Sequence, residues 1–228
     1  EFANAAIEKG LVSYRERNPK TAELPEVALV AIELKTGDVK VMIGGKDFAT
    51  SPYNRVTQAK RQPGSAFKPI IYLAALEEGM KPTTMVRDAP VSFTNPWTKQ
   101  VWSPHNYRNE YHGDVTLRRA LELSLNTATV RVLERVGVEN VIELAKRLHI
   151  TAPFEPNLSL ALGSTEVMPL ELALAYATIA RGGYYLPPVA VLNISTIENE
   201  ELYADQPAEP ELVVNSELAT MMIDMMKG

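Results

Sequence analysis

The clearest chemistry in the sequence lies in a serine and a lysine three positions apart. Ser65 and Lys68 stand at the start of an apolar run that predicts a helix, and this spacing puts both side chains on one face. A serine hydroxyl attacks only when a base takes its proton, and an amine is such a base only where burial or nearby cations favour its neutral form. The start of a helix also presents backbone N–H groups to a developing anion. The pair predicts acyl transfer through serine.

The same spacing has an ordinary structural interpretation. A serine at this position is commonly an N-cap, and a lysine in the first turn is commonly a solvated side chain. A second polar segment, Ser124-Leu125-Asn126, stands between two predicted helices and by itself would also be a cap. A Ser-x-x-Lys helix start combined with a later Ser-x-Asn is typical of enzymes that acylate a serine. The combination therefore favours chemistry over capping.

Several longer segments carry a resemblance to a known family. They are YNR at 53–55 with QA at 58–59, RQPGSAFKP at 61–69, WSPHNY at 102–107, LRRAL at 117–121 before SLN at 124–126, and LALGS at 160–164 before PLE at 169–171. With these segments, residues 27–228 resemble the transpeptidase domain of class A penicillin-binding proteins, which are bifunctional peptidoglycan synthases.

The resemblance implies an activity and a set of roles. The activity is that of a D,D-transpeptidase, which crosslinks peptidoglycan stem peptides ending in D-Ala-D-Ala through a serine acyl-enzyme and is inhibited by β-lactam antibiotics. Ser65 would be the nucleophile and Lys68 the base for acylation. Ser124 would relay a proton towards the leaving amine, and Asn126 would anchor the substrate amide or Lys68. The residues expected to bind substrate are Gly64, Trp102 and Asn106.

Other functions are compatible with the same motifs. They are a non-hydrolysing β-lactam sensor domain, a non-catalytic assembly module and a serine β-lactamase. The β-lactamase is disfavoured because the Glu-x-x-Leu-Asn pattern of its deacylating glutamate occurs at 122–126, where it overlaps the Ser-x-Asn segment. We therefore interpret Glu122 as a surface carboxylate at a helix end. Glu166 and Glu171 suit the N-terminus of a helix, where the dipole favours carboxylates.

The resemblance also implies a cellular setting. The chain would be extracytoplasmic, in the periplasm or on the outer face of the cytoplasmic membrane. Its parent protein would carry a membrane anchor and a glycosyltransferase domain upstream of Glu1, and cell-wall assembly proteins are possible partners.

The family's third motif, Lys-Thr/Ser-Gly-Thr/Ser on an inner strand of the sheet, would follow the other two and supply carboxylate recognition and part of the oxyanion hole. The sequence reaches Gly228 without it. The string KTG at 35–37 precedes the other motifs and is followed by Asp38, so we interpret it as a hairpin turn. We expect the strand with the third motif to complete the sheet beside 27–43, supplied by another chain, another copy or residues outside this sequence.

Composition narrows the possible chemistry. Hydrophobic residues make up 46% of the 228, enough to bury a real core, and the net charge is -5 with dispersed Lys and Arg. Such a surface offers no basic stripe for nucleic acid. There is no cysteine, which excludes disulfides and thiol nucleophiles, and the three histidines are too dispersed for a metal motif. Catalysis must rest on hydroxyls, amines and carboxylates, with no cofactor or metal.

The surrounding patterns predict an α+β fold like that of penicillin-binding proteins and serine β-lactamases, a mostly antiparallel sheet packed against a helical body. Residues 1–26 are expected to form a lead-in helix and linker, and 27–228 a transpeptidase domain that is incomplete at its C-terminus. Helices are predicted at 2–17, 65–78, 117–123, 127–136, 140–148, 169–181 and from 216, and hairpins at 27–43 and 189–203. The aromatic-rich stretch 83–113 is expected to be irregular, with Trp97 and Trp102 lining a cleft or filling core.

Overall fold

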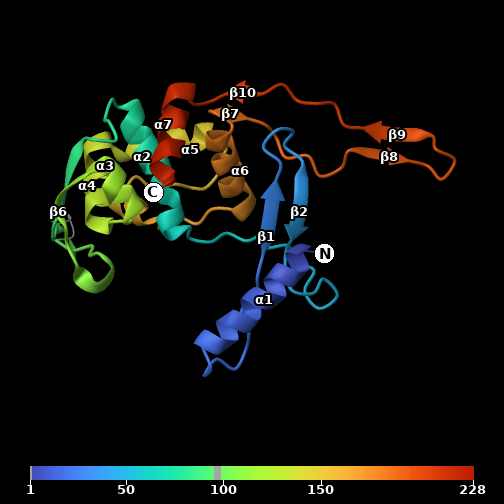
Figure 1. Cartoon of the computed structure of the whole chain (residues 1–228), viewed down its shortest axis with the longest axis horizontal. Coiled ribbons are helices and arrows are strands. Elements are labelled where there is room, and N and C mark those ends of the chain that lie inside the picture. Colours follow the sequence, from blue (N-terminus) through green and yellow to red (C-terminus); the bar gives the residue numbers. More distant parts are fainter. Residues whose placement is uncertain (1, 95–98) are drawn as a thin grey trace.

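Four helices, α3, α4, α5 and α7, pack around α2, which is buried along almost its whole length (Figure 1). The structure is a computed structural model that describes residues 2–94 and 99–228. In chain order the helices are α1 (Phe2–Arg17), α2 (Lys68–Glu77), α3 (Leu117–Glu122), α4 (Asn126–Val136), α5 (Val138–Arg147), α6 (Pro169–Ala180) and α7 (Ser216–Met226). Short 3-10 segments accompany them: η1 (Gly64–Phe67), η2 (Tyr107–Asn109) and η3 (Leu158–Leu162). Because α2 is apolar on all sides, it is a core helix.

The strands pair two by two, and each of the strand pairs in the described residues is antiparallel. The pairs are β1 (Leu29–Ile32) with β2 (Val39–Ile43), β3 (Met85–Asp88) with β6 (Gly113–Thr116), β4 (Phe93–Thr94) with β5 (Val101–Trp102), β7 (Tyr184–Tyr185) with β10 (Glu211–Leu212), and β8 (Asn193–Ser195) with β9 (Glu201–Ala204). The turn between β1 and β2 is closed by a bond from Gly37 N to Glu33 O at 2.9 Å. The interpretation of KTG at 35–37 as a hairpin turn is therefore confirmed.

The predicted helix at 65–78 begins differently from the expectation. Its first turn is the 3-10 segment η1, in which the N–H of Lys68 donates to the carbonyl of Ser65, and the α-helix proper starts at Lys68. The reason is Pro69, which has no N–H to donate to the Ser65 carbonyl in an α-helical bond. The other predicted helices are confirmed, with ends that differ by one or two residues.

The stretch 83–113 is more regular than predicted. It contains β3, β4, β5 and the start of β6, and β3 pairs with β6 so that Val86 lies opposite Val115. These strands are too short to show an alternating pattern and depend on partners distant in sequence. Trp97 lies outside the described residues.

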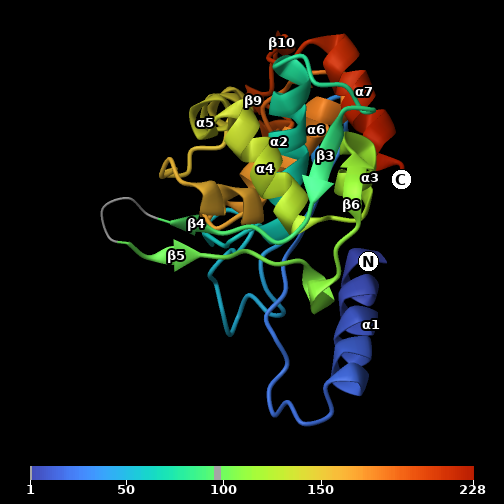
Figure 2. The same ribbon diagram turned by 90° about the vertical axis from the view of Figure 1, so that its left-hand side faces the viewer.

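Two segments extend from the helical body. Figures 1 and 2 show α1 apart from the other helices, and none of its described residues is buried. The β8–β9 hairpin also projects outward (Figure 1). Among the described residues, no helix has the length and apolar character needed to span a bilayer. The boundary at residue 26 stays a prediction.

The β1–β2 hairpin has little support from other strands. Beyond its own pairing, the described residues add one parallel bridge, between Asp38 and Val189. On the hairpin Met42 is 36% exposed and Leu34 is 44% exposed. A two-stranded hairpin is marginal without a third strand or a covering layer. The expectation that a further strand completes this sheet stays a prediction.

Candidate functional site

The amine of Lys68 lies among three oxygen atoms from the segment that joins α3 to α4. Its Nζ donates to the carbonyl O of Ser124 at 2.6 Å, to Asn126 Oδ1 at 2.7 Å and to Ser124 Oγ at 3.0 Å. The residue is only 1% exposed. Burial without a carboxylate partner in the described residues lowers the pKa of Lys68 from 10.5 to about 8. The amine is therefore prepared to exchange a proton near neutral pH.

The three acceptors differ in what they can do for a neutral amine. A neutral Lys68 amine has two N–H donors and one lone pair. The Ser124 carbonyl and Asn126 Oδ1 can only accept, so they take the two N–H bonds. The Ser124 hydroxyl can donate, and at 3.0 Å it is placed to exchange a proton with the lone pair. The neutral amine thus has two groups that only accept hydrogen bonds, and one hydroxyl, that of Ser124, with which it can exchange a proton.

Ser65 lies on η1, one turn before Lys68, and its side chain is exposed. We expected Ser65 and Lys68 to be joined by a hydrogen bond with Ser124 close by. Ser124 does contact Lys68, but in the described structure no hydrogen bond joins the side chains of Ser65 and Lys68. The oxygens of 124–126 satisfy the buried amine, and the Ser65 hydroxyl stays open to a ligand.

Ser124 holds a rare backbone conformation. Its φ of 51° is in the left-handed region, which non-glycine residues seldom adopt. Ser124 N donates to Leu121 O at 2.8 Å and Leu125 N donates to Ala120 O at 2.9 Å, and these bonds close the end of α3. The resulting turn directs both the carbonyl and the hydroxyl of Ser124 towards Lys68. Strained residues of this kind cluster at functional sites.

The orientation of the Asn126 side chain is fixed from its other end. Its Nδ2 donates to the carbonyl of His105 at 2.9 Å, which leaves Oδ1 facing Lys68. A carbonyl only accepts, so the amide cannot rotate by half a turn without losing this bond. Of the two roles expected for Asn126, the contact with Lys68 is present in the structure.

The side chain of Asn106 is enclosed by the protein, and its substrate-binding role stays a prediction. The residue is 3% exposed, and both ends of its amide are occupied within the protein. Its Nδ2 donates to Asp88 Oδ1 at 2.8 Å and to Glu110 O at 2.9 Å. Its Oδ1 accepts from the backbone N–H groups of Asn126 at 2.7 Å and Thr127 at 3.2 Å. Asn106 therefore caps the first turn of α4.

Sequence analysis missed Asp88, which is fully buried at the end of β3. Besides Asn106, it accepts from Thr127 Oγ1 at 2.5 Å and from His112 through its backbone N at 2.8 Å and Nδ1 at 3.2 Å. Burial raises the pKa of the Asp88 carboxyl, but these hydrogen bonds outweigh it and hold the pKa below its ordinary value. A lone aspartate before Ala-Pro carries no motif, so only its position in the fold reveals it.

Trp102 and Gly64, the other residues expected to bind substrate, lie in different surroundings. Trp102 packs against Phe93 with ring centroids 5.8 Å apart and lines a hollow of about 350 Å³ that reaches Asn157 and Ser159. Gly64 begins η1, and its N–H donates to the carbonyl of Gly163 on the chain after η3 at 3.3 Å. Substrate binding by Trp102 and Gly64 stays a prediction.

Two of the three glutamates considered in the sequence, Glu122 and Glu171, make structural contacts. Glu122 forms an ion pair with Arg119 at 3.1 Å near the end of α3. Glu171 lies in the first turn of α6 and accepts from Thr151 Oγ1 at 2.5 Å, as expected for a carboxylate at a helix N-terminus. Glu166 is exposed just before α6.

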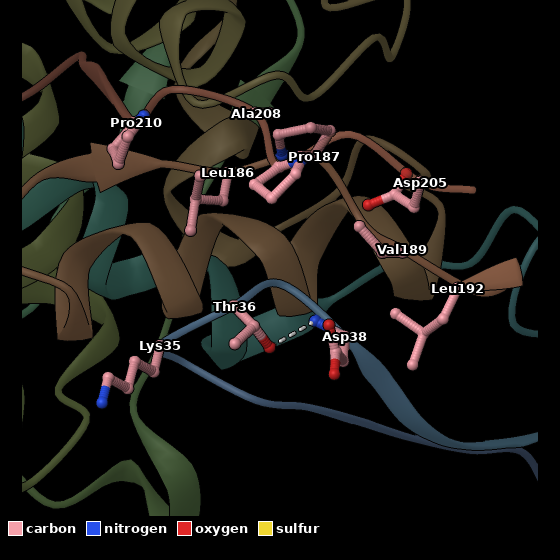
Figure 3. A pocket seen from close by; sticks show the side chains of 11 residues that line it. Lys35, Thr36, Asp38, Leu186, Pro187, Val189, Leu192, Asp205, Ala208 and Pro210 are labelled. Atoms are coloured by element: carbon pink, nitrogen blue, oxygen red, sulfur yellow. Dashed lines mark hydrogen bonds between the residues drawn. The ribbon is translucent and has the colours of Figure 1, made fainter.

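A separate hollow of about 490 Å³ opens between the β1–β2 turn and the segments on either side of the β8–β9 hairpin (Figure 3). Thr36 and Asp38 lie on one side of it, joined by a bond from Asp38 N to Thr36 Oγ1 at 3.2 Å, and Pro187 and Asp205 on the other. No residue of the Lys68 site lines this hollow.

Comparison with known families agrees with this geometry. The family model described as the penicillin-binding protein transpeptidase domain matches residues 27–228. The chain belongs to this family. The resemblance to class A penicillin-binding proteins is thereby confirmed, together with the fold class.

Curated and solved penicillin-binding proteins show the same relationship. Penicillin-binding protein 1A of Pseudomonas aeruginosa is 39% identical over 193 residues, which are 84% of this chain and 23% of that protein. Penicillin-binding protein 1A of Aquifex aeolicus is 39% identical over 203 residues, which are 89% of this chain and 28% of that protein. The crystal structure of penicillin-binding protein 1A from Haemophilus influenzae superposes with a TM-score of 0.84 at 27% identity, covering 89% of this chain and 35% of that chain. The chain thus spans about a quarter of the length of these curated relatives.

Proposed function

We propose that the complete protein is a D,D-transpeptidase that acts through an acyl-enzyme on Ser65, and that β-lactams acylate the same serine. The observation that carries the proposal is the buried amine of Lys68, whose pKa is lowered to about 8 one turn after an exposed serine. Membership of the penicillin-binding transpeptidase family supports it. An amine with a pKa near the working pH is an efficient general base.

In the acylation step, Ser65 Oγ attacks the carbonyl carbon of the penultimate D-Ala of a stem peptide, and its proton passes to the neutral amine of Lys68. A tetrahedral intermediate forms, and its C–N bond breaks. Lys68 returns the proton through the Ser124 hydroxyl, 3.0 Å from Nζ, to the nitrogen of the leaving D-Ala. The products are free D-Ala and an ester on Ser65.

In the second step, the amine of a neighbouring stem peptide attacks the ester carbonyl, and Ser65 leaves with the proton given up by that amine. A peptide crosslink forms and the enzyme is regenerated. With a β-lactam, the same attack opens the four-membered ring, and the ring nitrogen takes the proton. That nitrogen stays tethered to the acyl group, so it cannot diffuse away as D-Ala does.

The wider setting is proposed on the family relationship alone. The parent protein would be a bifunctional peptidoglycan synthase with a glycosyltransferase domain, anchored in the membrane and acting outside the cytoplasm. Reaction of the complete protein with lipid-linked disaccharide precursor and analysis of the glycan chains tests the glycosyltransferase activity. Fractionation of cells tests the location.

Labelling with fluorescent penicillin tests the acyl-enzyme. In the complete protein, Ser65→Ala removes the covalent label, whereas Ser216→Ala, at another exposed serine near a helix start, keeps it. Label that survives Ser65→Ala with unchanged intensity refutes the assignment of the nucleophile. Release of D-Ala and formation of crosslinked dimers from stem peptides separate a transpeptidase from a sensor or assembly module. Rapid release of penicilloate would indicate a β-lactamase.

A further inference from the structure

A continuous series of hydrogen bonds runs from Asp88 to the Lys68 amine. Asp88 Oδ1 accepts from Asn106 Nδ2 at 2.8 Å, and Asn106 Oδ1 accepts from the backbone N–H of Asn126 at 2.7 Å. Asn126 Oδ1 in turn accepts from Lys68 Nζ at 2.7 Å. Asp88 also accepts from the hydroxyl of Thr127 at 2.5 Å, so it holds the first turn of α4 at two points. The buried carboxylate of Asp88 is thus linked to the proposed base, Lys68, through the side chains of Asn106 and Asn126, whose orientations are fixed by their hydrogen bonds.

The acceptor-only character of the carboxylate sets the direction of each later bond. An ionised aspartate has no proton to donate, so Asn106 must turn its NH₂ group towards Asp88. The carbonyl end of Asn106 then faces α4, where the unpaired N–H groups of Asn126 and Thr127 need acceptors. The Glu110 carbonyl, which accepts from Nδ2 at 2.9 Å, favours the same orientation, so a neutral amide in place of Asp88 weakens this constraint without removing it.

The surroundings of Asp88 explain why the carboxylate stays ionised. Four donors surround it, from Asn106, Thr127 and the backbone and ring of His112. Arg131 on α4 donates to the backbone carbonyls on either side of Asp88, at 3.3 Å to Arg87 and 2.8 Å to Ala89. A buried carboxylate bonded in this way is typical of a residue that fixes the geometry of its neighbours.

We propose that Asp88 is the positioning residue of this site, which acts through Asn106 and Thr127 to hold Asn126 and the Ser124 turn against Lys68. Asp88 does not touch substrate or Lys68 itself. Its role is to keep the acceptors of the amine in place while a proton moves. This inference rests on the proposed acylation of Ser65, because it concerns the same amine.

The test measures acylation of the complete purified protein by fluorescent penicillin in rapid-mixing experiments, which give the acylation rate constant and the dissociation constant separately. Asp88→Ala lowers the rate constant by about 100-fold, the loss expected when reacting groups are displaced by about 1 Å, and leaves the dissociation constant unchanged. Asp88→Asn keeps the shape of the side chain and gives a smaller loss. Asp114→Asn is the matched control, because it removes the same charge from the neighbouring strand at an exposed ion pair with Arg87 and leaves the rate unchanged.

A double-mutant cycle separates positioning from a general effect on the fold. If Asp88 acts through Asn126, then Asp88→Asn causes little further loss of rate in an Asn126→Ala background. Losses that multiply fully overturn the proposal. The proposal is also overturned if Asp88→Asn is acylated at the wild-type rate while its circular dichroism spectrum and melting temperature are normal. If Asp88→Ala does not fold, the result with Asp88→Asn alone tests the proposal. If the wild-type protein and the Asp114→Asn control are not acylated either, the proposed function itself fails.

Discussion

Acylation of Ser65 should depend steeply on pH because the proposed base is a buried amine. The pKa of Lys68 is about 8, so roughly half of the amine is neutral at pH 8 and about 1% at pH 6. If the neutral amine takes the proton of Ser65, the acylation rate constant falls about 50-fold between these pH values. Below pH 7 the loss approaches tenfold for each pH unit.

The same pKa makes a second, independent prediction about stability. In the folded protein the pKa of Lys68 is about 8, against 10.5 for an ordinary lysine, so between these values the unfolded state binds more protons. The free energy of unfolding therefore rises with pH across this window, and the difference corresponds to about 3 kcal/mol in total. Below pH 8 the folded state bears this penalty in full, and above pH 10.5 the penalty is gone.

Stopped-flow acylation of the complete protein at pH 6 to 9 checks the first effect, and denaturant unfolding checks the second. Relative to Lys68→Met, the wild-type protein gains about 2 kcal/mol of stability between pH 7 and pH 9.5. Lys81→Met, which removes an exposed lysine, is the control for the substitution itself. Hydrogen bonds lost in Lys68→Met are lost at every pH, so they leave this difference unaffected. A flat acylation profile, together with a pH-independent stability difference, would refute a buried amine that titrates near pH 8.

Four further substitutions test other parts of the site and fold. Lys68→Arg should abolish acylation almost as fully as Lys68→Ala, because guanidinium does not deprotonate at working pH; an active arginine variant in the penicillin assay would show that charge alone suffices. Gly163→Ala should cost about 3 kcal/mol or more in thermal unfolding and slow acylation, because its Cβ would lie 2.2 Å from the Gly64 carbonyl at a φ of +64°. Gly79→Ala, at a φ of +81° with no atom within 4 Å of the added Cβ, should lower the stability by only about 1 kcal/mol. If Gly163→Ala and Gly79→Ala lower the stability equally, the close contact at Gly163 does not explain the loss there. Asn215→Ala should cost about 1 kcal/mol in the same assay, because Asn215 Oδ1 caps α7 through the N–H of Glu217 at 2.8 Å, and an unchanged melting temperature would contradict it.

Local patterns in the sequence were enough to find the chemical groups. The spacing of Ser65 and Lys68, the apolar run that follows them and the break at 124–126 are all properties of short segments. Helices such as α4 and α6 were predictable for the same reason, since their hydrogen bonds and their apolar periodicity are contained within about a dozen residues. The hairpin turn at 35–37 also followed from its own residues.

The partners of these groups were decided by tertiary packing. Lys68 bonds to Ser124 and Asn126, which are 56 and 58 positions away, and not to the nearby Ser65. Asn106 proved to be a buried cap and Asp88 a hidden partner, because the pairing of β3 with β6 and its contact with α4 enclose both. A side chain's identity fixes what bonds it can make, but burial decides which of them must be made inside the protein, since a buried polar group without a partner is strongly destabilising. That requirement depends on residues brought together from distant parts of the chain, so it has no local pattern in the sequence.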